Sequence, residues 1–210
     1  FLFESLFTSE FGGSAWDSAT NQYVYDSEQG KTAAVNTLQF IQDITQYAQD
    51  SYVEYSRFDV RTLLRDGKVA MVLDAINMAN QVSDQLADGT IRCTVMPAGA
   101  SGINSSAVNV GGWYIPTNSQ HPDEAWTFLR YMMRTENQLA HAAYGSVPML
   151  KSEAASYTDG YMVQVVKSLD NSYAEGICPQ TNALWAVNGK QLQLLMMGKQ
   201  SAADTQANIA

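Results

Sequence analysis

"LLRDGKVAMVLDAINMANQVSDQLADGTIRCTVMP", residues 63–97, decides the fold class that the sequence predicts. The apolar run of residues 68–73 has the length of a buried strand, and residues 91–97 form a second such run. We expect a short helix near residues 78–86 between the two runs. Buried strands that are separated by helices are typical of a sheet covered by helices. The sequence therefore predicts an α/β fold.

A third strand is expected in residues 107–116, interrupted by Gly111 and Gly112. Glycine inside a strand usually marks a bulge or a place where a ligand or another backbone comes close. From Pro122 onward the chain is predicted to be mostly helical. Hydrophobic spacing and capping residues predict helices at about residues 31–50, 58–65, 122–133, 161–169, 183–197 and 201–208. One more helix is expected from Thr135 to near Gly145, opened by a capping box of Thr135 and Gln138.

The excess of acidic over basic residues argues against nucleic acids and anionic membranes as partners. The sequence has 12 Lys and Arg against 21 Asp and Glu, a net charge of -9, which repels nucleic-acid phosphates and anionic lipids. No stretch reaches the roughly 18 apolar residues of a membrane helix. The two cysteines, Cys93 and Cys178, can form one disulfide or remain two buried thiols. We predict no metal, no cofactor and no nucleic-acid partner.

Catalytic motifs do not occur in the sequence. His121 and His141 are the only histidines, and neither lies at zinc-site spacing from another ligand. The sequence has no nucleophile elbow and no phosphate-binding glycine motif. Paired carboxylates such as Asp74 and Glu4 could serve a glycosidase, but the sequence does not place them at a working separation. A carbohydrate-active enzyme that uses such acids and a protein-interaction module stay open as alternatives to a binding protein.

The aromatic residues make a sugar site chemically possible. They form 10% of the chain and include four tryptophans. Aromatic faces suit sugar rings, whose C–H surfaces stack on them while polar groups bind the hydroxyls. Trp126 lies within a predicted helix and is expected in the core, whereas for Trp16 core and ligand roles are about even. Trp113, after the glycine pair, and Trp185, in the first turn of a helix, are the better candidates.

Five segments together resemble the extracellular solute-binding proteins of ABC sugar importers, the group that includes the maltose-binding protein. They follow the order and approximate spacing of that family across nearly the whole chain. The segments are "LLRDGKVAMVLD", "IRCTVMPAGASG", "NVGGWYIPTNSQHPDEAWTFLRYMMRTENQ", "YGSVPML" and "NALWAVNGKQLQLLMMGKQSAADTQAN".

The resemblance implies a two-lobed α/β fold of the type II periplasmic-binding-protein class with a helix-rich C-terminal part. It matches the C-terminal half of the family, so that the opening units of the first lobe and a lipoprotein signal are expected to be missing. Residues 1–92 would form the α/β part of the second lobe. Residues 93–146 would form a hinge strand and the segment that rejoins the first lobe, and residues 147–210 the helices that complete the second lobe.

The resemblance also implies which residues bind the ligand. Trp185 matches the sugar-stacking tryptophan near the C-terminus of relatives, and Phe3 falls near an aromatic segment of the cleft. The stretch Gly111, Gly112, Trp113 and Tyr114 would border the cleft beside the hinge. Relatives commonly carry a Gly-x-Trp where this chain has Asp74 and Asn77. That exchange removes a stacking platform and adds hydrogen-bonding groups, which argues against a maltose-like specificity while keeping carbohydrate as the ligand.

The implied function is binding without catalysis. A carbohydrate would be closed between the lobes and delivered to the transmembrane subunits of an ABC permease. The protein would work in the periplasm or on the outer face of the cell membrane, touching the membrane only through a lipid anchor on the missing N-terminus.

Overall fold

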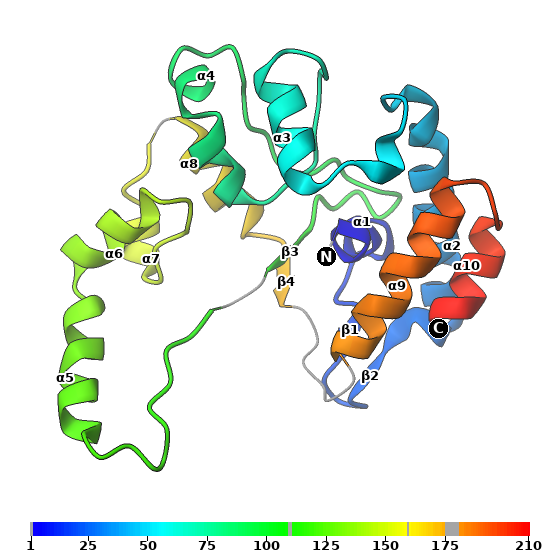
Figure 1. The fold of residues 1–210 in the computed structure, drawn as a ribbon. Coiled ribbons are helices and arrows are strands. Elements are labelled where there is room, and N and C mark those ends of the chain that lie inside the picture. The colour runs from blue at the N-terminus through cyan, green and yellow to red at the C-terminus, as the bar shows by residue number, and fades with distance from the viewer. Residues whose placement is uncertain (1, 109–110, 159, 175–180) are drawn as a thin grey trace. The chain divides into compact units, whose positions relative to one another are not determined.

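The computed structural model describes residues 2–108, 111–158, 160–174 and 181–210, and most of its regular structure is helical (Figure 1). The helices in these residues are α1 (Leu2–Phe11), α2 (Glu28–Ile44), α3 (Arg57–Arg65), α4 (Ser83–Ala87), α5 (Pro122–Met132), α6 (Thr135–Ala142), α7 (Lys151–Ala154), α8 (Gly160–Ser168), α9 (Thr181–Met196) and α10 (Ala202–Ile209). The strands are β1 (Trp16–Asp17), β2 (Gln22–Tyr23), β3 (Ser106–Val108) and β4 (Ser172–Ala174). β1 pairs antiparallel with β2, and β3 pairs parallel with β4.

The chain divides into two compact units. The first unit contains Phe1–Leu73, Val95–Asn109 and Ser168–Ala210, and the second contains Asp74–Thr94 and Val110–Lys167. The predicted division into residues 1–92, 93–146 and 147–210 concerns the lobes of a longer protein and stays a prediction.

The core of the first unit is built by α1, α2, α9 and α10. The side chains of Phe7, Leu38 and Leu195 have no exposed surface. The ring of Phe7 lies edge-on to Tyr25 with centroids 4.8 Å apart and stacks on Phe11 at 5.3 Å. Burying a large apolar side chain contributes about 1.5–3 kcal/mol, so this cluster is the main source of stability in the first unit.

Helix α2 begins where the chain turns sharply at Val24–Ser27. The Ser27 side chain accepts a hydrogen bond of 3.0 Å from the backbone N–H of Gly30, which caps the helix. Gly30 is buried at this turn, and a Cβ built on it would overlap the Val24 carbonyl oxygen. Only glycine therefore fits at this position without a shift of the backbone.

Replacing Gly30 with alanine is expected to destabilise the chain by roughly 2–3 kcal/mol, toward the upper end of the range for overpacking. The new methyl group cannot rotate away from a backbone carbonyl, so the first turn of α2 has to move. Urea denaturation followed by circular dichroism measures the loss. Gly189→Ala is the matched control, because a Cβ there meets nothing within 4 Å and alanine favours the interior of α9. Equal losses in the two variants would contradict the steric explanation.

Serine side chains join α1 to the strand β3. The Ser9 hydroxyl accepts a hydrogen bond from the backbone N–H of Ser105 at 2.9 Å and donates to the Ser105 carbonyl at 3.1 Å. One turn earlier, the Ser5 hydroxyl accepts from the N–H of Ala107 at 2.9 Å. Ser101 in turn donates to the Ser9 carbonyl. These bonds hold α1 against the start of β3, while β4 pairs with the strand itself.

The second unit has a smaller buried core. Its helices α4, α5, α6, α7 and α8 have 11 residues or fewer, and no residue of α5 is buried. The buried apolar side chains in its described residues are Ala79, Val82, Ala142, Ala154 and Met162.

Most of the predicted helices are confirmed, because their signals are local. Ser56 and Asp59 form the capping box that starts α3, and Ser201 and Asp204 form the one that starts α10. Hydrogen bonds from Ser56 lower the pKa of the Asp59 carboxyl group, so this cap weakens as the pH falls. The capping box predicted at Thr135 is wrong. Arg134 occupies the N-cap position of α6 without a side-chain hydrogen bond.

Two of the predicted strands are wrong. Residues 68–73 and 91–97 have no strand pairing, and Met71 is 88% exposed. A strand forms only where a neighbouring strand accepts its hydrogen bonds, and the described residues contain only the β1–β2 and β3–β4 pairs. The third strand is confirmed in part: β3 covers Ser106–Val108, whereas residues 111–116 are not strand.

The alternative of two buried thiols is wrong for Cys93, which is exposed. Cys93 carries a free, exposed thiol, and partial burial raises its pKa. Cys178 lies outside the described residues, so a Cys93–Cys178 disulfide is not tested.

Candidate functional site

The candidate site is a cavity of about 120 Å³ between α1 and α9 in the first unit. Two of the predicted ligand-binding residues, Phe3 and Trp185, lie in its wall. The full lining is Phe3, Glu4, Trp185, Asn188, Gly189 and Leu192.

One face of α9 supplies most of the wall. Trp185, Asn188, Gly189 and Leu192 are separated by three, one and three residues, a spacing that places side chains on the same side of a helix. No atom lies within 4 Å of a Cβ built on Gly189, so the glycine leaves open space beside the tryptophan. Trp185 is 40% exposed, so part of its indole is accessible.

Two polar groups accompany the indole. Glu4 is only 6% exposed, which places a carboxylate of α1 in a largely buried part of the wall. On α9, the Oδ1 atom of Asn188 is buried and has no hydrogen-bond partner among the described residues. An unsatisfied buried polar atom costs about 1–3 kcal/mol, and a hydroxyl of a bound ligand could remove that cost.

Phe3 supports the cavity from beneath. It is 3% exposed and belongs to the core cluster, with its ring 5.7 Å from Tyr25 and 6.2 Å from Phe7. Its role is to fix the position of α1, and through it Glu4. An aromatic face, a carboxylate and an amide oxygen around a small hollow are the groups that recognise one ring of a carbohydrate.

The other predicted ligand-binding residues belong to the second unit. Trp113 is 63% exposed and its ring lies edge-on to Phe128 of α5, with centroids 6.3 Å apart. Tyr114 is almost fully exposed. A Cβ on Gly111 would meet no atom within 4 Å, and one on Gly112 would meet only the ring of Tyr114. The backbone at the glycine pair is thus open to an approaching molecule.

Asp74 and Asn77 form a separate group in the second unit. Both are exposed, and Asp74 Oδ1 accepts a hydrogen bond of 2.7 Å from the N–H of Ala75. Asn77 lies against the turn at Gly145, where a Cβ would come within 3.0 Å of the Asn77 Cα. The assignment of all eight predicted residues to a single ligand site stays a prediction.

Trp126 was predicted to be buried, and this is wrong. It is 58% exposed. The half-buried face of α5 is formed instead by Ala125, Leu129 and Met132, and the indole projects beside that face.

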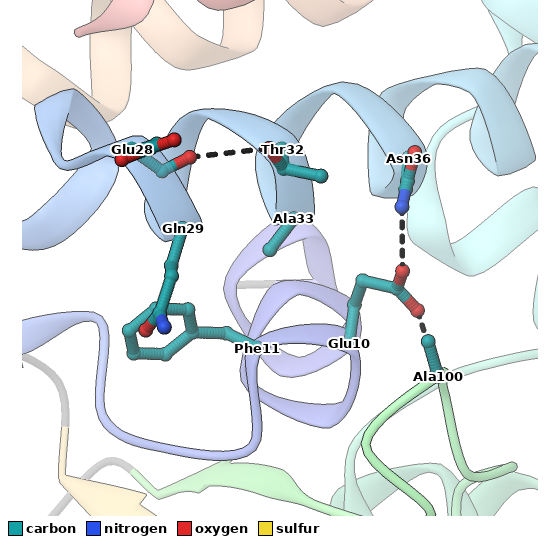
Figure 2. A pocket seen from close by; sticks show the side chains of 8 residues that line it. All are labelled: Glu10, Phe11, Glu28, Gln29, Thr32, Ala33, Asn36 and Ala100. Carbon is teal, nitrogen blue, oxygen red and sulfur yellow. Dashed lines mark hydrogen bonds between the residues drawn. The ribbon is translucent and has the colours of Figure 1, made fainter.

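A second hollow in the first unit has a structural explanation (Figure 2). This groove has a volume of about 600 Å³ and runs along α1, α2 and the loop at Ala100. Both oxygens of Glu10 are engaged: Oε1 accepts from Asn36 Nδ2 at 2.9 Å, and Oε2 accepts from the Ala100 N–H at 2.7 Å. The Thr32 hydroxyl donates to the carbonyl of Glu28. The Glu10 carboxylate therefore joins three segments of the fold, and the cavity at Trp185 is the better candidate.

Three residues of the cavity wall were not predicted, although the sequence carries a signal for them: Asn188, Gly189 and Leu192. They follow Trp185 at helical spacing and could have been named once that residue was chosen. Glu4 could not have been assigned in this way, because only the fold brings α1 to this face of α9.

The described residues contain no group of three or more His, Cys, Asp or Glu side chains arranged to hold a metal ion. None of the helices formed by these residues has the length and apolar character needed to span a bilayer.

Comparison with known sequences gives a family match. The model of the bacterial extracellular solute-binding protein family matches residues 4–166. Two similar curated proteins, from Brucella abortus strain 2308 and Brucella suis biovar 1, are both named as binding proteins. Each is 26% identical over 113 residues, which are 50% of this chain and 26% of the relative. The match thus covers only a part of these longer proteins.

Comparison with solved structures shows the fold. Maltose-bound MalE3 of T. maritima has a TM-score of 0.76 at 20% identity, over 99% of this chain and 55% of that one. A sugar transporter protein of Arthrobacter chlorophenolicus A6 with bound laminaribiose has a TM-score of 0.75 at 16% identity, over 99% and 54%. The chain thus spans about half the length of these proteins. These likenesses confirm the predicted α/β fold of the type II class.

Proposed function

The chain belongs to the family of bacterial extracellular solute-binding proteins, and from this premise we propose that it captures a carbohydrate as the substrate-binding component of an ABC transporter. The solute would be a mono- or oligosaccharide. The protein would act outside the cytoplasmic membrane and deliver the sugar to the transmembrane subunits of a permease.

The wall around Trp185 is the observation that supports a carbohydrate. The accessible indole offers a face for the C–H surface of a sugar ring, while Glu4 and Asn188 offer acceptors for its hydroxyls. Two structures of the same fold carry maltose and laminaribiose, according to their descriptions. The cavity of about 120 Å³ is smaller than the roughly 300–1,000 Å³ of ligand pockets, so it fits one part of a larger site.

We place the rest of that site in a cleft between two lobes. Trp113, Tyr114 and the glycine pair 111–112 would border it on one side, and Asp74 and Asn77 would contribute hydrogen bonds in place of a second stacking residue. Binding energy from stacking and buried hydrogen bonds would favour the closed arrangement of the lobes. Only the difference in affinity between the open and closed states can shift that population.

The enzyme alternative has little support in the described residues. Glycoside hydrolysis needs two carboxyl groups about 5–10 Å apart on either side of the bond that is cleaved. The cavity at Trp185 is lined by one carboxylate, that of Glu4. The exposed Asp74 engages the neighbouring N–H of Ala75.

Saturation-transfer NMR tests the proposal on the chain as it stands. The chain spans about half of the length of its relatives, so we expect weak binding, with dissociation constants in the millimolar range. Such binding is detectable at about 1–10 mM sugar. Ring protons of maltose, maltotetraose or laminaribiose should receive saturation, and the sugars should remain intact on chromatography. Leucine and glutamate serve as control solutes and should receive none. Saturation of no sugar in the panel would reject the ligand class, and release of shorter sugars would favour an enzyme.

A further inference from the structure

Helix α5 carries an exposed stripe that the proposed sugar site does not use. Asp123, Trp126 and Arg130 are all exposed and are separated by three and four residues, so that they follow one another along one face of the helix. Trp126 lies in the middle of the stripe and leaves 58% of its surface exposed. Exposed aromatic residues of this kind are enriched at protein–protein contacts.

The charges of the stripe are divided between its two ends. Asp123 lies in the first turn of α5 and Arg130 in the last. Neither Asp123 nor Arg130 forms an ion pair with another described residue. The order along the stripe is therefore acidic, aromatic, basic, with both charges available.

We propose that this stripe binds a second copy of the same chain, with the two α5 helices antiparallel and related by a two-fold axis at Trp126. Reversing the helix exchanges the acidic and basic ends. Trp126 then lies against Trp126 of the second copy, and each Asp123 lies opposite the Arg130 of the other. A two-fold contact requires one surface patch to be complementary to itself, and this sequence of charges meets that requirement.

A second copy fits the stripe better than the other classes of partner. The net charge of -9 and the acidic first turn of α5 disfavour an anionic membrane surface. A small solute requires a hollow, and neither of the two cavities at α1 includes a residue of α5. Ala125, Leu129 and Met132 are half-buried, whereas Trp126 is exposed, as are Phe128 and Tyr131 on other sides of the helix. Of these exposed aromatic residues, Trp126 is the one that lies between two opposite charges at helical spacing.

The contact should be weak and dependent on concentration. A single pair of helices buries less surface than the roughly 1,200–2,000 Å² of a stable complex. The two tryptophans would supply most of the affinity, since aromatic residues at the centre of a contact dominate its energy. The two ion pairs at its rim would set the antiparallel orientation.

Sedimentation equilibrium between about 10 µM and about 1 mM tests this proposal, because weak association becomes populated in that range. The average mass should rise from that of the monomer toward that of a dimer. Trp126→Ala should raise the dissociation constant at least about tenfold. Asp123→Arg and Arg130→Asp should each weaken association severalfold by placing like charges opposite each other, and the double variant should restore it.

Lys199→Glu is the control for net charge, because it alters an exposed residue of the first unit and should leave association unchanged. All these changes are at exposed positions, and far-UV circular dichroism should confirm that each variant is folded. A chain that stays monomeric throughout would overturn the proposal and leave the stripe to another occupant, such as a part of the longer relatives. The proposal would also be overturned if the charge reversals did not weaken association, or if the double variant did not restore it.

Discussion

Replacing Phe7 with alanine is expected to lower the free energy of unfolding by about 3–5 kcal/mol. Phe7 has no exposed surface and is surrounded by three rings, those of Phe3, Phe11 and Tyr25. The substitution removes the buried aromatic area and leaves a cavity among side chains of α1 and of the turn at Val24–Asp26. The neighbouring rings cannot collapse into it without moving α1 from α2, so the cost should lie near the upper part of the range for core truncations.

Urea denaturation measures this effect, with near-UV circular dichroism reporting on the aromatic core and far-UV on the helices. Phe58→Ala is the matched control, because the same ring is removed from a position that is 66% exposed, and it should cost less than about 1 kcal/mol. A loss for Phe7→Ala no larger than that of the control would mean that the ring cluster does not hold the first unit together.

The helices other than α1 and α7 could be predicted from the sequence, because each of their signals lies within the element. Ser56 and Asp59 are three residues apart, and that spacing alone specifies the capping box that starts α3. The same reasoning finds α10 from Ser201 and Asp204. The failure at Thr135 shows the limit, because the start of α6 is one residue earlier and the expected side-chain bond is not made.

The strands could not be predicted in the same way, because pairing depends on distant parts of the chain. The run at residues 68–73 is apolar enough for a buried strand, yet Met71 is exposed and the segment is unpaired. β3 forms where Ser5 and Ser9 bind one side of the backbone and β4 the other. Hydrophobicity indicates that a segment can be buried and does not show which partner will bury it.

Trp126 is exposed although its sequence position indicated a buried residue, whereas Trp185 lies as its sequence position indicated. Trp126 was predicted to be buried because it lies within a helix. Burial depends, however, on which side of α5 packs against the rest of its unit, and that side is formed by Ala125, Leu129 and Met132. For Trp185 the sequence position and the family resemblance agree with an accessible side chain in a cavity wall. The two residues consequently belong to two different surfaces, and this makes a crossed experiment possible.

Trp185→Ala is expected to weaken carbohydrate binding by roughly 30- to 100-fold, equivalent to about 2–3 kcal/mol, and so to remove the saturation-transfer signal. The indole is the only aromatic face in the cavity wall that is substantially exposed, since Phe3 is 3% exposed. Its removal leaves Glu4 and Asn188 in place but without a surface that holds the ring against them. Stability should fall less than in Phe7→Ala, because part of the side chain is already in contact with solvent.

The crossed control is Trp126→Ala, which removes the same side chain from the second unit. It should leave sugar binding unchanged while weakening self-association, whereas Trp185→Ala should do the reverse. Trp185→Phe should recover part of the affinity if stacking is the cause, since a smaller aromatic face remains. If a Trp185 variant kept full sugar binding, this cavity would not be part of the sugar site. That conclusion would hold whether or not the chain associates with itself. Loss of both properties in either single variant would instead indicate that the two surfaces are coupled.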